Sequence, residues 1–291
     1  MAELYFNYVE MMKEINTYMN KFKLLSVTNA SKSILENNIP ALIVGEGKSI
    51  IAYVGGEEGC DSISSLVLLQ FVRDICSLYE EGGSAFGFSA ESILKSYTLV
   101  IIPMLNPDGS RYCSEGLEAD NPLRERAIRL NKGSEDFSCW RGNARGVELK
   151  YNYGAEYGEN EPEVEVGAIC NFFRYGFKPD ILLSFSQANS NGCNGCNDCN
   201  GKIFFGEGET ENKIAIALSQ MSGMSRIFRA CEPPQFMISD WAITEIGAAA
   251  FSFELPNIKF KSKRQFEDKS FSCYAQIRKA LFCAPFLNKI K

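Results

Sequence analysis

The sequence predicts a single α/β domain with a largely parallel or mixed sheet. Short β-branched and aromatic runs alternate with segments of helical spacing along the chain. No internal repeat and no linker divides residues 1–291, so they are predicted to form one domain. A length of 291 residues with 45% hydrophobic content is sufficient to bury a large core.

The expected elements follow in chain order. Strands are short apolar runs, and we expect them at residues 24–27, 39–44, 50–54, 97–103, 181–185, 203–205 and 248–255. Helices repeat apolar residues every three or four positions, and we expect them at residues 5–22, 62–79, 163–175, 211–221, 239–246 and 266–282. Residues 146–153 are predicted as a strand leading into a loop, and residues 110–145 as polar, irregular chain.

Residues 45–49, Gly-Glu-Gly-Lys-Ser, resemble a phosphate-binding loop only in part. Leu42 stands where the first glycine is needed, and a strand follows instead of a helix. We therefore predict a hairpin-like turn here.

Residues 55–61, Gly-Gly-Glu-Glu-Gly-Cys-Asp, form the loop around which the rest of the chain is interpreted. The loop follows a buried strand and opens a helix, which is where α/β folds place their sites. Asp61 or Ser62 is expected to cap the helix, and Glu57 is expected to be solvated. On these residues alone, an acidic solvated turn is the favoured interpretation.

Composition excludes several classes of function. The net charge of −6 does not suggest nucleic acid or an anionic membrane as a partner. Residues 1–21 carry charges inside a helical pattern, unlike a signal peptide, and no later run is expected to span a bilayer. Eleven scattered cysteines favour a reduced, cytoplasmic chain.

The chain contains no histidine. The commonest general base and the commonest metal ligand are therefore missing. Neither a Ser-His-Asp nor a Cys-His arrangement can form, and any metal ion must be bound by oxygen or thiolate.

Four segments occur in the order found in a known family. They are residues 102–109, 146–149, 179–185 and 251–255, and the turn Pro-Met-Leu-Asn-Pro-Asp-Gly in the first of them is the most specific. The sequence of these segments resembles the zinc carboxypeptidase family, in particular the bacterial peptidases that cut γ-D-glutamyl-diaminopimelate bonds. The resemblance implies an α/β/α domain with a mixed, roughly eight-stranded sheet.

The resemblance also implies where a zinc site would lie. Family members hold zinc with His-x-x-Glu and a distant His, and these positions fall on Glu58, Asp61 and Ser186. All three ligand positions are altered. Two carboxylates and a hydroxyl form a hard but weak ligand set, which suits Mg²⁺ or Ca²⁺ better than Zn²⁺. Because the set is weak, no cofactor is expected at the ancestral site.

Further roles follow from the same resemblance. Glu254 matches the general base, and either Arg141 or Arg145 matches the arginine that stabilises the oxyanion. The Asn-Arg pair that binds the substrate carboxylate falls on Lys150 and Tyr151, with Asn152 beside them. Trp140 and Trp241 are expected to be packing residues.

A cysteine-rich loop follows Ser186. Cys193, Cys196 and Cys199, together with Cys60, have a spacing that could hold zinc or an iron–sulfur cluster. The alternative, a flexible Asn/Gly loop with free thiols, is favoured slightly.

Three functional hypotheses remain open. The first is a degenerate family member, inactive or very weak as a peptidase, that binds a peptide such as a cell-wall stem peptide in the inherited cleft. The second is an active metallopeptidase with a non-standard metal site at Glu58, Asp61 or the cysteine loop. The third is a regulatory module that senses metal or redox state through its cysteines.

Overall fold

A computed structural model describes residues 6–154, 161–188, 200–229, 237–256 and 262–287. These residues form one eight-stranded mixed sheet in the order β1-β2-β6-β3-β7-β10-β8-β9, which confirms the predicted fold class. Its strands are β1 Leu25–Lys32, β2 Asn38–Val44, β3 Ser49–Val54, β6 Tyr97–Ile102, β7 Ile181–Gln187, β8 Lys202–Phe205, β9 Ser225–Phe228 and β10 Ala249–Leu255. Two short strands, β4 Ser84–Ala85 and β5 Phe88–Ser89, pair separately.

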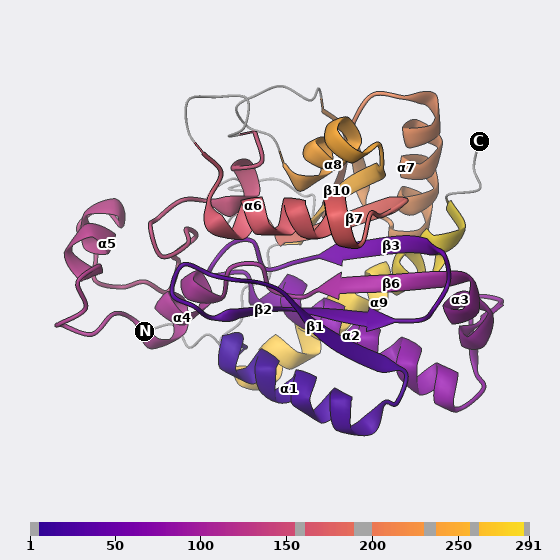
Figure 1. The fold of residues 1–291 in the computed structure, drawn as a ribbon, viewed down its shortest axis with the longest axis horizontal. Coiled ribbons are helices and arrows are strands. Elements are labelled where there is room, and N and C mark those ends of the chain that lie inside the picture. Colours follow the sequence, from indigo (N-terminus) through magenta and orange to yellow (C-terminus); the bar gives the residue numbers. More distant parts are fainter. Residues whose placement is uncertain (1–5, 155–160, 189–199, 230–236, 257–261, 288–291) are drawn as a thin grey trace.

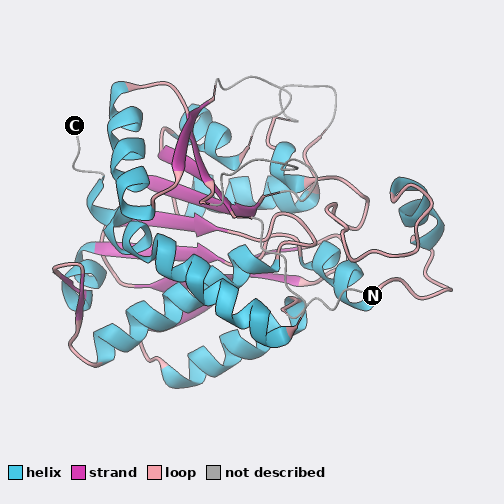
Figure 2. Cartoon of the chain, turned by 180° about the vertical axis from the view of Figure 1, so that it is seen from behind, coloured by secondary structure: helices cyan, strands magenta, loops and turns pink. Residues whose placement is uncertain are grey.

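Helices cover both faces of the sheet (Figures 1 and 2). The described helices are α1 Tyr8–Lys21, α2 Ser62–Glu80, α3 Ala90–Ser96, α4 Pro107–Glu115, α5 Arg124–Leu130, α6 Val164–Asn171, α7 Glu209–Ser222, α8 Ile238–Ile246 and α9 Lys263–Leu287. A π-helical turn, Phe172–Gly176, extends α6, and a single 3₁₀ turn spans Leu149–Tyr151.

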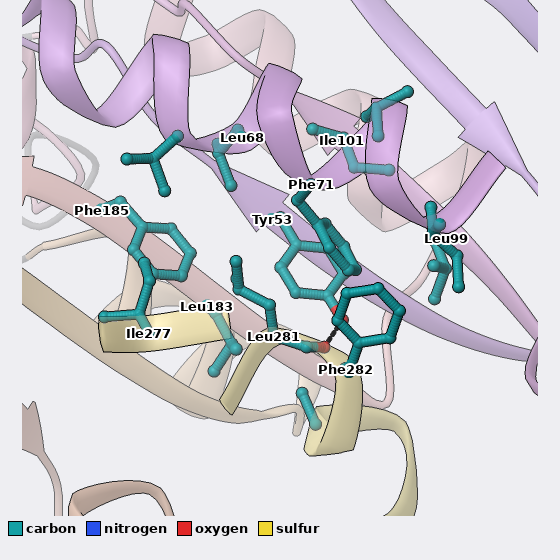
Figure 3. Packing of buried hydrophobic residues seen from close by; sticks show 14 of the residues in the cluster. Tyr53, Leu68, Phe71, Leu99, Ile101, Leu183, Phe185, Ile277, Leu281 and Phe282 are labelled. Atoms are coloured by element: carbon teal, nitrogen blue, oxygen red, sulfur yellow. Dashed lines mark hydrogen bonds between the residues drawn. The ribbon is translucent and has the colours of Figure 1, made fainter. Parts of the chain in front are cut away.

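Successive side chains along the central strands point to opposite faces of the sheet, and each face packs into its own hydrophobic core. In β3, Ile51 and Tyr53 face the core shared with α1, α2, α7 and α9, whereas Ala52 and Val54 face the core shared with α6 and α8. Figure 3 shows the first core, where the Tyr53 hydroxyl donates a hydrogen bond to the Leu281 carbonyl oxygen at 2.9 Å.

Helix α2 is part of this first core. Its length and composition would allow it to cross a membrane, contrary to our expectation that no run is long enough. Because 61% of its apolar window is buried inside the protein, α2 serves here as a core helix.

The predicted hairpin-like turn after β2 is wrong. Strand β6 lies between β2 and β3, antiparallel to the first and parallel to the second. The connecting chain crosses the start of β6, where Glu46 N donates to Leu94 O at 3.0 Å and Thr98 Oγ1 donates to Gly47 O at 2.7 Å. A Cβ at Gly47 would lie 1.9 Å from the Ser96 carbonyl carbon, so this crossing requires glycine.

Other local predictions also need correction. Helices α4 and α5 occupy part of the segment expected to be irregular, and residues 146–153 contain a 3₁₀ turn instead of a strand. Asn106 caps α4 by accepting from Gly109 N at 2.9 Å, and Tyr112 and Cys113 bury the helix against Trp140. This burial depends on a partner 28 residues after Tyr112, since Trp140 is far outside a local sequence window.

Candidate functional site

The ends of three parallel strands bring the altered positions together. Strands β3, β7 and β10 are mutually parallel neighbours, so their carboxyl ends meet at one edge of the sheet. Glu254 in β10 lies directly opposite Ser186 in β7. The loop of residues 55–61 follows β3 at the same edge.

Hydrogen bonds connect the loop of residues 55–61 to the turn that follows β6. Leu105 N donates to Gly55 O at 3.0 Å, and Asn106 N donates to Gly56 O at 2.9 Å. The Asn106 side chain donates to Glu57 O at 3.1 Å, which ties the carboxylate-bearing residues to the same turn. A Cβ on Gly59 would meet the Gly109 carbonyl carbon at 2.6 Å, so only glycine permits this approach.

Lys150 points into the centre of the site. Its Nζ donates a hydrogen bond to Ser186 Oγ at 2.9 Å and lies 3.9 Å from both Glu58 Oε1 and Glu254 Oε2. The Lys150 side chain is only 4% exposed. The Tyr151 ring lies 5.6 Å from the same ammonium and is partly exposed at the edge of the site.

The two arginines are placed differently. Arg141 Nη2 donates to Glu58 Oε1 at 2.6 Å, and its Nε donates to Glu148 Oε1 at 3.2 Å. Arg145 instead lies 3.7 Å from Glu163 and is 45% exposed. Arg141 is therefore the arginine that contacts the site.

The Asp61 carboxylate accepts hydrogen bonds from two elements of the fold, α2 and β7. Its Oδ1 accepts from Ser64 N at 3.0 Å, and its Oδ2 accepts from Ser64 Oγ at 2.7 Å. The same Oδ2 accepts from Gln187 N at 3.1 Å, which joins α2 to β7. Asp61 thus caps α2, and it is one of the two residues, Asp61 or Ser62, expected to do so.

Burial dominates the electrostatics of the loop. Desolvation raises the pKa of Glu57 and of Glu58 to about 7, and it also raises the pKa of Asp61. Lys150 opposes each of these increases because a nearby positive charge favours the carboxylate.

The expectation that Glu57 is solvated is wrong. Glu57 is 1% exposed and accepts a hydrogen bond from the Tyr153 hydroxyl at 2.8 Å. Sequence reasoning missed this pair because its partners are 96 positions apart and neither belongs to a spacing pattern. Asn152, which the resemblance places beside the substrate-binding pair, accepts a hydrogen bond from Glu163 N at 2.7 Å.

Comparison with known proteins identifies the family. A family model described as zinc carboxypeptidase matches residues 8–170. The chain belongs to the zinc carboxypeptidase family.

Relatives and solved structures agree with this assignment. The chain is 27% identical over 152 residues to gamma-D-glutamyl-L-diamino acid endopeptidase 1 of Lysinibacillus sphaericus, and the match covers 52% of this chain and 38% of that protein. It therefore spans well under half the length of this curated relative.

Two solved structures share the fold. A metallo-carboxypeptidase from Burkholderia cenocepacia has a TM-score of 0.66 at 15% identity and covers 96% of this chain and 69% of its own. Thrombin activatable fibrinolysis inhibitor has a TM-score of 0.65 at 16% identity, with coverage of 97% and 72%.

The side chains at the three positions that hold zinc in the family already accept hydrogen bonds from other groups of this chain. Glu58 Oε1 already accepts from a guanidinium, both Asp61 oxygens accept hydrogen bonds, and Ser186 Oγ accepts from an ammonium. A dication here would displace these donors and would face the charge of Lys150 at close range. Within the described ranges, no three His, Cys, Asp or Glu side chains converge to bind a metal ion.

The cysteine hypothesis can be examined only at Cys60. Cys193, Cys196 and Cys199 lie outside the described residues. Cys60 packs against the cluster of Tyr112 and Trp140, and burial raises the pKa of its thiol to about 12. Both metal binding and oxidation require the thiolate, so this environment opposes either role for Cys60.

We expect iodoacetamide at pH 7.5 to modify Cys60 at least about tenfold more slowly than Cys139, because Cys60 is protonated and half-buried whereas Cys139 is exposed. Peptide mass spectrometry over a time course measures both rates in one sample. Equal rates would show that the Cys60 thiol is accessible and ionised.

Proposed function

We propose that this zinc carboxypeptidase homologue binds a peptide at the inherited site without cutting it by zinc-dependent hydrolysis. One observation carries the proposal: internal donors already engage the side chains at all three ligand positions, Glu58, Asp61 and Ser186. Hydrolysis in the family depends on a metal ion that acidifies water and polarises the carbonyl.

The remaining groups are poorly placed to replace that contribution. Glu254 is 22% exposed and lies 3.9 Å from the buried Lys150 ammonium, where a metal ion would otherwise be needed to activate water. Glu58 and Glu148 engage Nη2 and Nε of Arg141, so fewer of its donors are left to stabilise an oxyanion. Both the activation of water and the stabilisation of the transition state are therefore weakened.

Side chains at the edge of the site support peptide binding. Tyr151 offers a partly exposed ring, and Arg141 and Glu254 each keep about a fifth of their side-chain surface exposed. The named relative is an endopeptidase that acts on γ-D-glutamyl-L-diamino acid bonds, and this supports a cell-wall stem peptide as the ligand.

We expect no cleavage when the purified protein is incubated with an L-Ala-γ-D-Glu-diaminopimelate peptide or with peptides carrying varied C-terminal residues. Mass spectrometry should give unchanged substrate with Zn²⁺, with Mg²⁺ and with a chelator. Isothermal titration calorimetry with the first peptide measures binding in parallel.

The matched control is Glu254→Gln, which removes the base and keeps the side-chain shape. Turnover that chelation abolishes, and that this variant lacks, would contradict the proposal and support an active metallopeptidase. Absence of binding to every peptide tested would contradict the binding part.

A further inference from the structure

The Lys150 ammonium contacts two of the three positions that hold zinc in the family, Ser186 and Glu58, and also the general-base position, Glu254. It donates to Ser186 at 2.9 Å, and it lies 3.9 Å from Glu58 and from Glu254. These residues come from three separate segments, namely β7, the loop after β3, and β10. We propose that Lys150 is a built-in cation that replaces the family's metal ion and holds these segments together.

Charge balance supports this assignment. Glu58 is 2% exposed, and Asp61 is also buried, so their carboxylates have little access to water. Buried carboxylates without a nearby cation are strongly destabilising. In the described part of the chain, Lys150 and Arg141 are the two cations that pair with Glu58, and Lys150 is the more deeply buried.

The backbone around Lys150 is anchored in the core. Lys150 lies in the 3₁₀ turn Leu149–Tyr151. The side chains of Leu149 and Tyr153, on either side of it, are buried in the core shared with α6 and α8. Asn152 N closes the turn by donating to Leu149 O at 3.0 Å. The lysine therefore projects from an anchored turn, and its position does not depend on a mobile surface segment.

This placement differs from the role implied by the resemblance, in which residue 150 binds a substrate carboxylate. A lysine that serves a substrate must present its ammonium to the entering group. Here the side chain is 4% exposed, and a hydrogen bond to Ser186 already engages the ammonium. A compact ammonium with three donors suits a site with several oxygen acceptors.

The test removes the cation and supplies it again from solution. Lys150→Ala should lower Tm by roughly 10 °C at pH 8, and millimolar methylammonium, Mg²⁺ or Ca²⁺ should restore several degrees, each compared with KCl at equal ionic strength. Wild type should show no such gain. Lys95→Ala, at an exposed pair with Glu91, is the control for losing a lysine and should keep the wild-type Tm.

A second pair of variants covers the case in which Lys150→Ala does not fold. Lys150→Arg retains the positive charge, whereas Lys150→Met retains most of the length without it. The arginine variant should have the higher Tm if charge is what the site requires. Equal Tm values for these two variants, or a folded Lys150→Ala that no cation stabilises, would overturn the proposal.

This inference rests on the proposed function, but different experimental results would contradict each of them. Loss of cation rescue would remove the assignment of Lys150 while leaving the absence of cleavage intact. Cleavage by wild type would remove the proposed function even with full rescue of Lys150→Ala.

Discussion

Arg141→Met should lower the free energy of unfolding by about 3 kcal/mol at pH 8, because it leaves a buried carboxylate without its closest cation. Arg141 lies 2.6 Å from Glu58 Oε1, and the Glu58 side chain is 2% exposed. The pKa of Glu58 is raised by burial to about 7 and is held down by Lys150 and Arg141. Above that pH the carboxylate is charged and needs both cations.

The effect should shrink as the pH falls. At pH 6 the Glu58 carboxyl takes up a proton in the folded state, so loss of Arg141 costs less. Urea denaturation at pH 6 and pH 8 measures both values. Arg145→Met is the matched control, since its 3.7 Å contact with Glu163 is half-exposed and should contribute less than about 1 kcal/mol.

A double-mutant cycle locates the interaction. In the background of Glu58→Gln, Arg141→Met should cost at least about 1 kcal/mol less than in wild type. Additive losses would show that Arg141 stabilises the fold through other contacts, such as the one with Glu148.

Glu57→Gln should flatten the pH dependence of stability between pH 5 and 7. Desolvation raises the pKa of Glu57 to about 7 in the folded protein, whereas the unfolded chain keeps the ordinary value of about 4.3. The folded state therefore holds the proton over a range in which the unfolded state has released it. The contribution of Glu57 to the free energy of unfolding is full below pH 4 and is lost as the pH rises through 7.

From pH 4.3 to pH 7, at roughly 1.4 kcal/mol per pH unit, wild type should lose about 4 kcal/mol of this contribution. Urea denaturation at half-unit steps of pH compares wild type with Glu57→Gln, and the difference between the curves isolates this carboxyl from other buried acids. Glu267→Gln, at an exposed position, makes the same charge change and should leave the slope as in wild type. Identical slopes for wild type and Glu57→Gln would contradict a buried, protonated Glu57.

Much of the site could be placed from motifs. Glu58, Asp61, Ser186 and Glu254 each follow or end a short apolar run, and the carboxyl ends of parallel strands meet at one edge. The helix cap at Asp61 was predictable because capping is a local interaction across three residues. Trp140 and Trp241 are buried in hydrophobic clusters, as expected of packing residues.

The contacts of the two cations, Lys150 and Arg141, could not be predicted from motifs. Lys150 and Ser186 are 36 positions apart, and Arg141 and Glu58 are 83 apart. No periodicity or spacing connects such residues, since their contact depends on how the 3₁₀ turn and the Arg141 segment pack over the sheet. The same limit explains why the helices α4 and α5 were missed.

The chain's own residue types determined the α/β fold, the order of the family segments and the absence of imidazole from every ligand position. Only the tertiary structure decided that an ammonium lies among the substituted groups and that Glu57 is buried against Tyr153. The physical reason is that these two kinds of information act over different distances along the chain. Local propensity and periodicity act over a few residues, whereas pairing of buried charges depends on which distant side chains the sheet brings within a few ångströms.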